Sequence, residues 1–387
     1  MTTIPYGKQH ISQQDVDEVV RCLESDFLTQ GPRIPKFEDD VANYCGATHA
    51  VAVNSATSAL HIACLALDVG PGDQVWTSAI TFVASANAAL YCGASVDFVD
   101  IDNESINMCP AQLEHKLIEA EQHGKLPKVV IPVHMCGHPC DMARIGELAE
   151  RFGFKIIEDA SHAVGASYGA ARVGSCEHSD IAVFSFHPVK IITTGEGGMA
   201  LTNNESLAEK MRLFRSHGVT REPGLLEHDE NDGWYYEQLE LGFNYRMTDL
   251  AAALGSSQML CLDEFVAARR TLADRYIDQL ADMPLSWPTE IESAASSYHL
   301  FVVMIDADDR RRRRDVFNQM RSRGIHVNVH YIPVYKQPYY QRFGFSKDYC
   351  PNAEQYYSRC LTLPLYPDLS IQDQDTVITA LTSALGS

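Results

Sequence analysis

The sequence predicts an α/β protein in which a large domain, built on a mostly parallel sheet of about seven strands, precedes a smaller α+β domain. Short apolar runs alternate with segments of helical periodicity from about residue 46 to residue 202, and this alternation is typical of βαβ units. After residue 203 the helical segments become longer and the strands fewer. The length of 387 residues also exceeds the roughly 100–200 residues of one typical domain.

Seven apolar runs are the candidate strands of the large sheet. They are residues 50–54, 74–77, 96–99, 129–133, 155–157, 181–184 and 198–201. Between them, residues 58–67, 84–91, 113–122 and 142–152 repeat apolar side chains at the spacing of an amphipathic helix. The turn Gly70-Pro71-Gly72 and Gly153 interrupt the pattern where loops are expected. The order of these elements therefore predicts a doubly wound layer.

The C-terminal part has a different pattern. We expect helices at residues 207–217, 247–283 and 313–323 and strands at residues 297–305 and 325–330. The polar, acidic segment 223–236 is predicted to be a surface loop or a mobile flap. We place the large domain at residues 1–252 and the small domain at residues 253–387.

Composition excludes several classes of protein. The formal net charge of −20, from 51 acidic and 31 basic residues, repels nucleic acid and anionic lipid. No stretch reaches the ~18 apolar residues that span a membrane, and the N-terminus lacks the apolar core of a signal peptide. The eleven cysteines include no C-x-x-C pair, which argues against a disulfide framework. We therefore expect a cytoplasmic protein without nucleic-acid or membrane partners.

Two neighbouring candidate strands end in residues with complementary chemistry. One continues into Asp159, and the next continues into Ser185 and, after a short turn, Lys190. Ligands of open α/β sheets bind beyond the carboxyl ends of the strands. A pyridoxal cofactor needs an amine to form an imine and an anion to keep its ring nitrogen protonated. Singly, Asp159 is more often a turn residue and Lys190 a solvated lysine, so it is their combination that indicates the cofactor.

A third segment suits the phosphate of such a cofactor. The first candidate strand runs through Asn54-Ser-Ala-Thr-Ser58 into a helix. The N-terminus of a helix offers free N–H groups and the positive end of its dipole to a dianion. On its own, this segment could equally be a capped helix after a strand.

Three motifs carry a family resemblance that extends over nearly the whole chain. They are NSATSAL at residues 54–60, SFHPVK at residues 185–190 and GFNYRMTD at residues 242–249. On these motifs the chain resembles the DegT/DnrJ/EryC1/StrS sugar aminotransferases. The resemblance implies a homodimeric transferase that depends on pyridoxal 5′-phosphate (PLP), with the fold type I of aspartate aminotransferase.

The resemblance also implies roles for individual residues. Lys190 would form the Schiff base with PLP, and Asp159 would face the pyridine nitrogen. The other implied cofactor contacts are Ala56, Thr57, Ser58, Phe82, His162, Ser185 and Asn244. Among these, Phe82 would stack on the ring, His162 would lie near the phenolic oxygen, and Asn244 would reach the phosphate from the neighbouring subunit.

Within the family, three further features resemble the transaminases of pseudaminic acid biosynthesis. They are Asp159-Ala-Ser-His162, the stretch FRSHG at residues 214–218, and Tyr6 in an N-terminal arm. The implied substrates are L-glutamate and a UDP-linked 4-keto-6-deoxy-N-acetylhexosamine, used in turn through pyridoxamine phosphate. The implied substrate-binding residues are Tyr6, Asp26, Phe27, Leu28, Thr29, Ala56, Ser185, Asn244, Asn328, Val329, His330 and Tyr331.

Other functions remain alternatives at this point. The acceptor could be another UDP- or dTDP-4-ketosugar, and a PLP-binding sensor or regulator without turnover would keep the same fold. A related sugar dehydratase would have a histidine in place of Lys190. A Rossmann oxidoreductase would need a G-x-G-x-x-G after an early strand, and the sequence has none there.

Two further clusters suggest binding sites but have simpler explanations. The segment His134-Met-Cys-Gly-His-Pro-Cys140 alternates histidine and cysteine, yet structural zinc sites usually pair ligands as C-x-x-C. We expect a loop there and no metal. Five consecutive arginines at residues 310–314 are flanked by aspartates, which favours a solvated helix start over an anion-binding patch.

Overall fold

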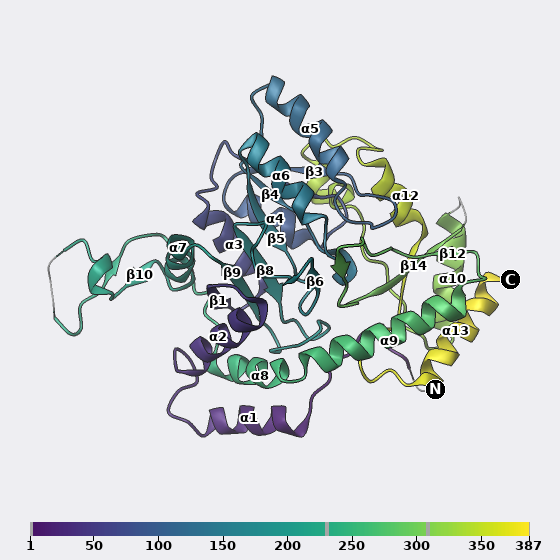
Figure 1. Cartoon of the computed structure of the whole chain (residues 1–387), viewed down its shortest axis with the longest axis horizontal. Coiled ribbons are helices and arrows are strands. Elements are labelled where there is room, and N and C mark those ends of the chain that lie inside the picture. Colours follow the sequence, from purple (N-terminus) through teal and green to yellow (C-terminus); the bar gives the residue numbers. More distant parts are fainter. Residues whose placement is uncertain (1–2, 229–231, 307–309, 387) are drawn as a thin grey trace.

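The computed structural model describes residues 3–228, 232–306 and 310–386, and a seven-stranded sheet lies at its centre (Figure 1). The strand order is β1 (His49–Val53), β9 (Gly198–Thr202), β8 (Ile181–Ser185), β5 (Lys155–Asp159), β4 (Val129–Ile131), β2 (Gln74–Ser78) and β3 (Ser95–Val99). β9 is antiparallel to both neighbours, and the other pairs are parallel. The predicted sheet is confirmed, and each strand lies within two residues of its predicted ends.

Helices cover both faces of this sheet. The helices of the large sheet are α3 (Ala56–Ala66), α4 (Val83–Tyr91), α5 (Pro110–Gln122), α6 (Met142–Phe152) and α7 (Glu205–Arg215). One face of the strands packs against α3, α4 and α7. The other face packs against α5 and α6 at one end and, at the other end, against α2 (Arg33–Cys45) and α8 (Asp249–Met259). Strands buried on both faces are typical of a parallel sheet, which explains their nearly continuous apolar sequences.

The long helix predicted at residues 247–283 is wrong as a single element. The chain forms α8 and then α9 (Leu262–Leu280), with a turn at Leu260 and Cys261. Because of this break, the two helices pack against different parts of the molecule. α8 packs against α1 (Gln13–Leu23) and α2, whereas α9 extends from the first hydrophobic cluster to a second one in the C-terminal part (Figure 1).

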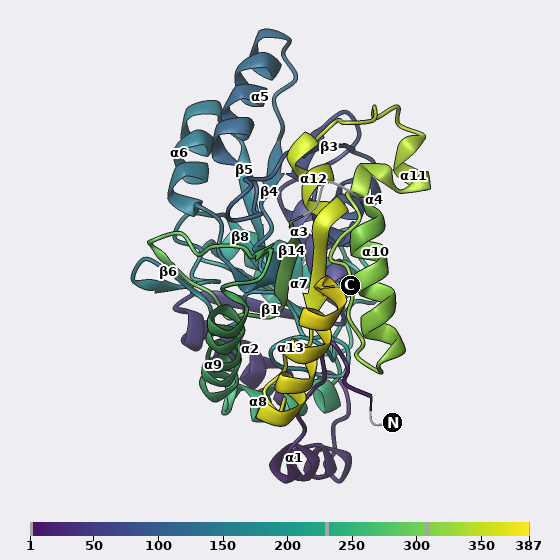
Figure 2. The same cartoon turned by 90° about the vertical axis from the view of Figure 1, so that its right-hand side faces the viewer.

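The C-terminal part contains a three-stranded antiparallel sheet covered by helices. Its strands are β12 (Leu285–Ser286), β14 (Phe301–Ile305) and β15 (Cys360–Leu363). Its helices are α10 (Arg310–Ser322), α11 (Pro338–Gln341), α12 (Pro351–Arg359) and α13 (Ile371–Leu385). Figure 2 shows α10 at the right of the molecule and α5 and α6 at its upper left.

The strand predicted at residues 325–330 is also wrong. Only single bridges form there, between Ile325 and Ile4 and between Asn328 and Thr362. The chain pairs briefly with the N-terminal arm and then with β15, so it never runs along one partner for a full strand. The residues after Val327 are thereby free to turn toward the large sheet.

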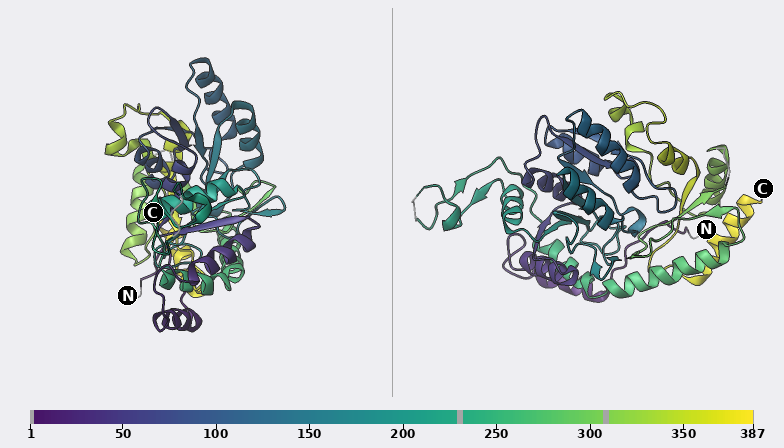
Figure 3. Two further views of the ribbon diagram at one scale, coloured as in Figure 1. Left: turned by 90° about the vertical axis from the view of Figure 1, so that its left-hand side faces the viewer. Right: turned by 45° about the horizontal axis from the view of Figure 1, so that its top comes forward.

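The segment 223–236 lies between β10 (Val219–Thr220) and β11 (Glu237–Gln238), which pair with each other. Its described residues contain one short 3-10 turn, Pro223–Leu225, so the predicted surface loop is confirmed for those residues. Figure 1 and the right-hand view of Figure 3 both show β10, β11 and the described residues next to them projecting away from the body of the molecule. A small sheet of β13 (Ala294–Ala295), β6 (Ser167–Tyr168) and β7 (Ala171–Arg172) completes the fold. In the part of the chain that the structure describes, no helix is long and apolar enough to cross a membrane.

Candidate active site

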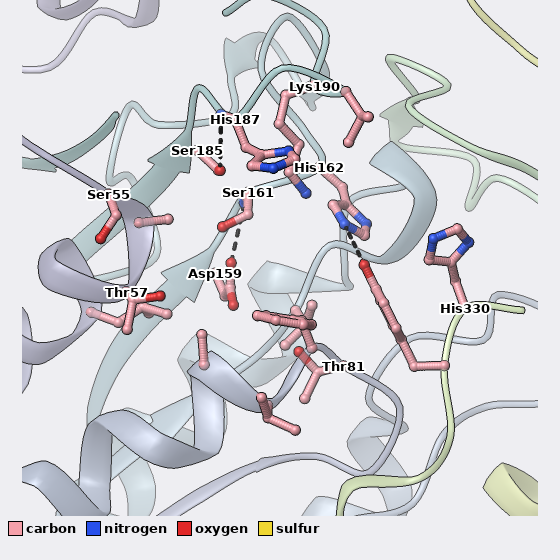
Figure 4. Close-up of a pocket in the computed structure, with 18 of the residues that line it drawn as sticks. Ser55, Thr57, Thr81, Asp159, Ser161, His162, Ser185, His187, Lys190 and His330 are labelled. Carbon is pink, nitrogen blue, oxygen red and sulfur yellow. Dashed lines mark hydrogen bonds between the residues drawn. The ribbon is translucent and has the colours of Figure 1, made fainter. Parts of the chain in front are cut away.

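A cavity of about 920 Å³ opens at the carboxyl ends of β4, β5 and β8 (Figure 4). The predicted site residues that line it are Tyr6, Ala56, Thr57, Ser58, Phe82, Asp159, His162, Ser185, Lys190, Asn328, Val329, His330 and Tyr331. They come from the N-terminal arm, the start of α3, the loop before α4, two strand ends and the segment after Val327. The fold therefore brings together residues that are up to 325 positions apart, from Tyr6 to Tyr331.

Sheet register places the acid and the lysine at the same edge. Asp159 is the last residue of β5 and pairs with Val183 of β8, while Ser185 ends β8. Beyond Ser185 the chain turns, and the N–H of Lys190 donates to the carbonyl of His187 at 2.8 Å. Parallel neighbouring strands end on one side of a sheet, so the lysine and the carboxylate face a common space (Figure 4).

Asp159 is held by hydroxyl and backbone donors. Its side chain is 5% exposed, and its Oδ2 accepts a hydrogen bond from the Ser85 hydroxyl at 2.6 Å. The backbone N–H of Ser161 donates to Oδ1 at 3.2 Å. The hydroxyls of Thr81 and Ser85 lie 2.7 Å apart. These contacts fix the carboxylate while leaving it in contact with the cavity.

Lys190 lies in a strongly desolvating environment. Its side chain is only half-buried because it borders the cavity, but protein surrounds the ammonium on its other sides. This desolvation lowers the pKa of Lys190 to about 8, although the negative charge of Asp159 acts in the opposite direction. At pH 7 about one tenth of Lys190 is therefore an uncharged amine, far more than for a lysine with its usual pKa.

Neutral aromatic rings line the opposite side of the cavity. Burial, followed by the charge of Lys190, lowers the pKa of His162 well below its usual value and the pKa of His330 to about 3. Burial also raises the pKa of Tyr331. The Tyr331 hydroxyl lies 3.2 Å from His162 Nε2. At neutral pH these three rings carry no charge, and the positive charge of Lys190 acts on both histidines.

The start of α3 forms a cradle for an anion. The Ser55 hydroxyl caps the helix by accepting from the N–H of Ser58 at 3.1 Å, and the first-turn N–H groups of Ala56 and Thr57 have no intrahelical acceptor. Gly198 lies directly behind this turn: a Cβ there would be 2.4 Å from the backbone nitrogen of Ala56. Only glycine fits at that distance. Three features of the cavity therefore match PLP. The amine of Lys190 suits its aldehyde, the carboxylate of Asp159 suits its ring nitrogen, and the start of α3 suits its phosphate.

Two predicted groups of residues lie outside the cavity of the single chain. Asn244 is exposed; its carbonyl accepts from Asn54 Nδ2 at 3.5 Å, and its backbone bridges Ser216. Asp26, Phe27, Leu28 and Thr29 form the exposed turn between α1 and α2. Thr29 pairs with Thr248, so this turn adjoins the segment that contains Asn244. Within the described chain neither group contacts the cavity.

Sequence reasoning missed other residues of the cavity. These are Asn54, Ser55, Leu60, Thr81, Val83, Ala84, Val133, Ser161, His187, Val189, Glu196, Ile332 and Gln337. Several belong to the motifs already quoted, and Asn54, Ser55 and His187 could have been found from them. Thr81 and Ser85 gave a weaker signal, namely two hydroxyls four residues apart at the start of a helix that follows a strand.

The histidine- and cysteine-rich loop forms a network of its own. His134 Nε2 lies 2.8 Å from Glu158, and its Nδ1 accepts from the N–H of Cys140 at 3.1 Å. Among the described residues, no group of three or more His, Cys, Asp or Glu side chains could hold a metal ion. The arginine run 310–314 lies at the start of α10, as expected, although residues 307–309 before it are outside the described residues.

The fold and this site define a PLP-dependent transferase of fold type I. The model of the DegT/DnrJ/EryC1/StrS aminotransferase family matches residues 9–382, and the chain belongs to that family. It is 38% identical to the spore coat polysaccharide biosynthesis protein SpsC of Bacillus subtilis over 98% of this chain and 96% of that protein. It is 35% identical to the UDP-4-amino-4,6-dideoxy-N-acetyl-beta-L-altrosamine transaminase of Campylobacter jejuni, over 99% of this chain and 97% of that one.

A solved structure agrees with these matches. The Helicobacter pylori aminotransferase PseC, involved in the biosynthesis of pseudoaminic acid, superposes with a TM-score of 0.91 at 29% identity, and the match covers 100% of both chains. The protein is therefore a PLP-dependent sugar aminotransferase.

Proposed function

We propose that this enzyme transfers the amino group of L-glutamate to the 4-keto carbon of a UDP-linked 4-keto-6-deoxy-N-acetylhexosamine, in two successive half-reactions. The observation that carries the proposal is the pairing of Lys190, whose amine is partly uncharged, with the buried carboxylate of Asp159 in one cavity. The 35% identity to the Campylobacter jejuni transaminase over 99% of the chain supports the choice of acceptor.

Lys190 has two roles in this proposal. Its amine would hold PLP covalently, because it is desolvated and directed into the cavity. With glutamate in the site, the free amine of Lys190 would take the proton from the α-carbon of glutamate and hold it on Nζ for return later in the half-reaction. In the second half-reaction it moves the protons in the reverse order.

Asp159 and the start of α3 hold the two ends of the cofactor. The carboxylate of Asp159, fixed by Ser85 and Ser161, would keep a proton on the pyridine nitrogen. PLP, when bound, supplies the electron-accepting ring that stabilises negative charge at the reacting carbon. Ser185 and the first-turn N–H groups at Ala56 and Thr57 would bind its phosphate.

A second acceptor class has its own support. The chain is 38% identical to SpsC, whose name places it in spore coat polysaccharide biosynthesis. Another UDP- or dTDP-linked 4-ketosugar is therefore the alternative substrate. A PLP-binding sensor without turnover would share the cavity but would not consume a ketosugar.

An absorption spectrum of the purified protein with PLP, recorded before and after addition of L-glutamate, tests the proposal. We expect a visible band from the lysine-linked cofactor that converts to a near-ultraviolet band of pyridoxamine phosphate. UDP- and dTDP-4-ketosugars are then added separately, and return of the visible band identifies the acceptor. A band that glutamate leaves unchanged would indicate a different amino donor or a sensor, and absence of any visible band would refute the role of Lys190.

We further propose that the enzyme is a homodimer in which Asn244 binds the phosphate in the partner's site. Support comes from the exposed position of Asn244, outside the cavity of its own chain. Subunits carrying Lys190→Ala mixed with subunits carrying Asn244→Ala should recover activity, because each mixed dimer contains one complete site. Random mixing gives mixed dimers in half of the population, so recovery should approach about one quarter of the wild-type rate. No recovery, with mixed dimers shown to be present, would contradict shared sites.

A further inference from the structure

The position of the hydrogen on His162 follows from its two partners. The backbone N–H of Cys136 donates to Nδ1 at 3.3 Å, so Nδ1 carries no hydrogen of its own. Burial and the charge of Lys190 keep the ring neutral, and its one N–H is therefore on Nε2. Nε2 lies 3.2 Å from the Tyr331 oxygen. His162 donates this hydrogen bond and Tyr331 accepts it.

The hydrogen on His330 can be assigned in the same way. The N–H of Val329 donates to Asn328 Oδ1 at 2.8 Å, which fixes the orientation of the amide. Nδ2 of Asn328 then donates to His330 Nε2 at 3.3 Å. The neutral His330 ring must carry its hydrogen on Nδ1, which donates to Thr362 Oγ1 at 2.8 Å. His330 therefore has no hydrogen available for a ligand in the cavity.

Tyr331, unlike His330, has a hydrogen available for a ligand in the cavity. Its oxygen accepts from His162, and among the described residues its hydroxyl has no other hydrogen-bond partner. Its own hydrogen is therefore unused, and Tyr331 lines the same cavity as Lys190 and Asp159. Burial raises the pKa of Tyr331, so the hydroxyl keeps this hydrogen throughout the ordinary pH range. His162 and His330 cannot donate a hydrogen bond to a ligand in their neutral forms, because His162 donates its hydrogen to Tyr331 and His330 donates its hydrogen to Thr362.

We propose that Tyr331 donates a hydrogen bond to the oxygen of the carbonyl group that exchanges with nitrogen, and that His162 positions its hydroxyl for this contact. The proposal rests on the proposed amino transfer to a ketosugar. In that transfer the amine nitrogen that came from glutamate adds to the carbonyl carbon of the ketosugar. The two hydrogens of the amine move to the carbonyl oxygen, which leaves as water. Negative charge develops on the oxygen as the nitrogen adds, and a fixed donor stabilises that charge. The 2-oxoglutarate formed from glutamate passes through the same exchange in reverse.

The variant Tyr331→Phe removes the hydroxyl and keeps the ring. We expect turnover of glutamate and ketosugar to fall about 100-fold, the size of effect seen when one such donor is removed. Exchange of the glutamate α-proton with D₂O should stay within about threefold of wild type, because Lys190 moves that proton before the C–O bond forms. A general disturbance of the site would slow both processes. Loss of exchange together with turnover would therefore contradict the proposal.

Tyr340→Phe is the matched control. Its hydroxyl donates to Asn87 Oδ1 at 2.6 Å, and Tyr340 does not line the cavity. Both turnover and α-proton exchange should stay near the wild-type level in this variant. If Tyr331→Phe behaves like Tyr340→Phe while the wild-type enzyme aminates its ketosugar, the role of Tyr331 is refuted and the proposed function stands. A wild-type enzyme that aminates no ketosugar overturns both.

A second measurement tests the hydrogen positions in the cofactor-free protein, independently of turnover. The ¹⁵N spectrum of protein labelled in its histidine rings should show the hydrogen of His162 on Nε2 and that of His330 on Nδ1, with assignments from His162→Gln and His330→Gln. In Tyr331→Phe the Nε2 signal of His162 should shift, because its acceptor has been removed. The reverse hydrogen position at His162 would overturn the proposal, since Tyr331 would then have to donate to His162.

Discussion

Lys190→Ala is expected to reduce turnover by more than about 10⁴-fold, the upper range for loss of a group that transfers protons. The variant loses both the amine that links the cofactor and the base that removes the α-proton. The side chain borders a cavity and is half-buried, so its removal leaves the fold intact. Steady-state assays with glutamate and ketosugar measure the rate, and an unchanged Tm verifies the fold.

Lys190→Arg tests whether a positive charge at this position is sufficient without an amine that can lose its proton. Arginine retains the charge but does not lose its proton near neutral pH, so this variant should be as inactive as Lys190→Ala. In the wild-type protein the pKa of Lys190 is lowered to about 8, and the free amine becomes more abundant as the pH rises to that value. Uptake of PLP by the cofactor-free protein, followed by the visible band, should accelerate as the pH rises, reach half of its maximal rate near pH ~8 and level off above that pH. More than a small residual rate in either variant would refute the assignment.

Asp159→Asn is expected to lower turnover by about 10³-fold, because it removes the anion that would keep the pyridine nitrogen protonated. The substitution is nearly isosteric, and the N–H of Ser161 still finds an acceptor in the amide oxygen. Loss of the Asp159 charge lowers the pKa of Lys190 further, and because that amine can release its proton, no unpaired buried charge remains and the Tm should not fall. Rate assays and thermal unfolding of the same preparation measure the two effects.

Asp159→Glu is the control for Asp159→Asn. It keeps the negative charge but moves the carboxylate by one methylene, away from Ser85 and Ser161. Its activity should lie between that of wild type and that of Asp159→Asn. Equal activities of Asp159→Asn and wild type would show that the charge has no role. Equal losses in both variants would show that position matters as much as charge.

Much of the fold could be predicted from the sequence because its signals are local. Each strand of the large sheet is a short apolar run between polar turns, and all seven are present. Helix α6 was predicted with the ends that it has, since Asp141 caps its start and Gly153 ends it in the left-handed conformation. The break between α8 and α9 could not be predicted, because the apolar periodicity continues through Leu260 and Cys261 while their packing partners change.

The sequence by itself determined that a lysine and an acid follow neighbouring strands, because strand polarity alone places Asp159 and Ser185 at one edge of a parallel sheet. Only the tertiary structure decided which distant residues join them. Ser85 lies 74 positions from Asp159, and Tyr331 lies 169 positions from His162, yet each pair is hydrogen-bonded. The physical reason is that periodicity and turn chemistry report on neighbours within a few residues. Contacts of this range are set by how whole elements pack, as when the chain leaves its brief pairing with Ile4 and Thr362 and turns toward the sheet.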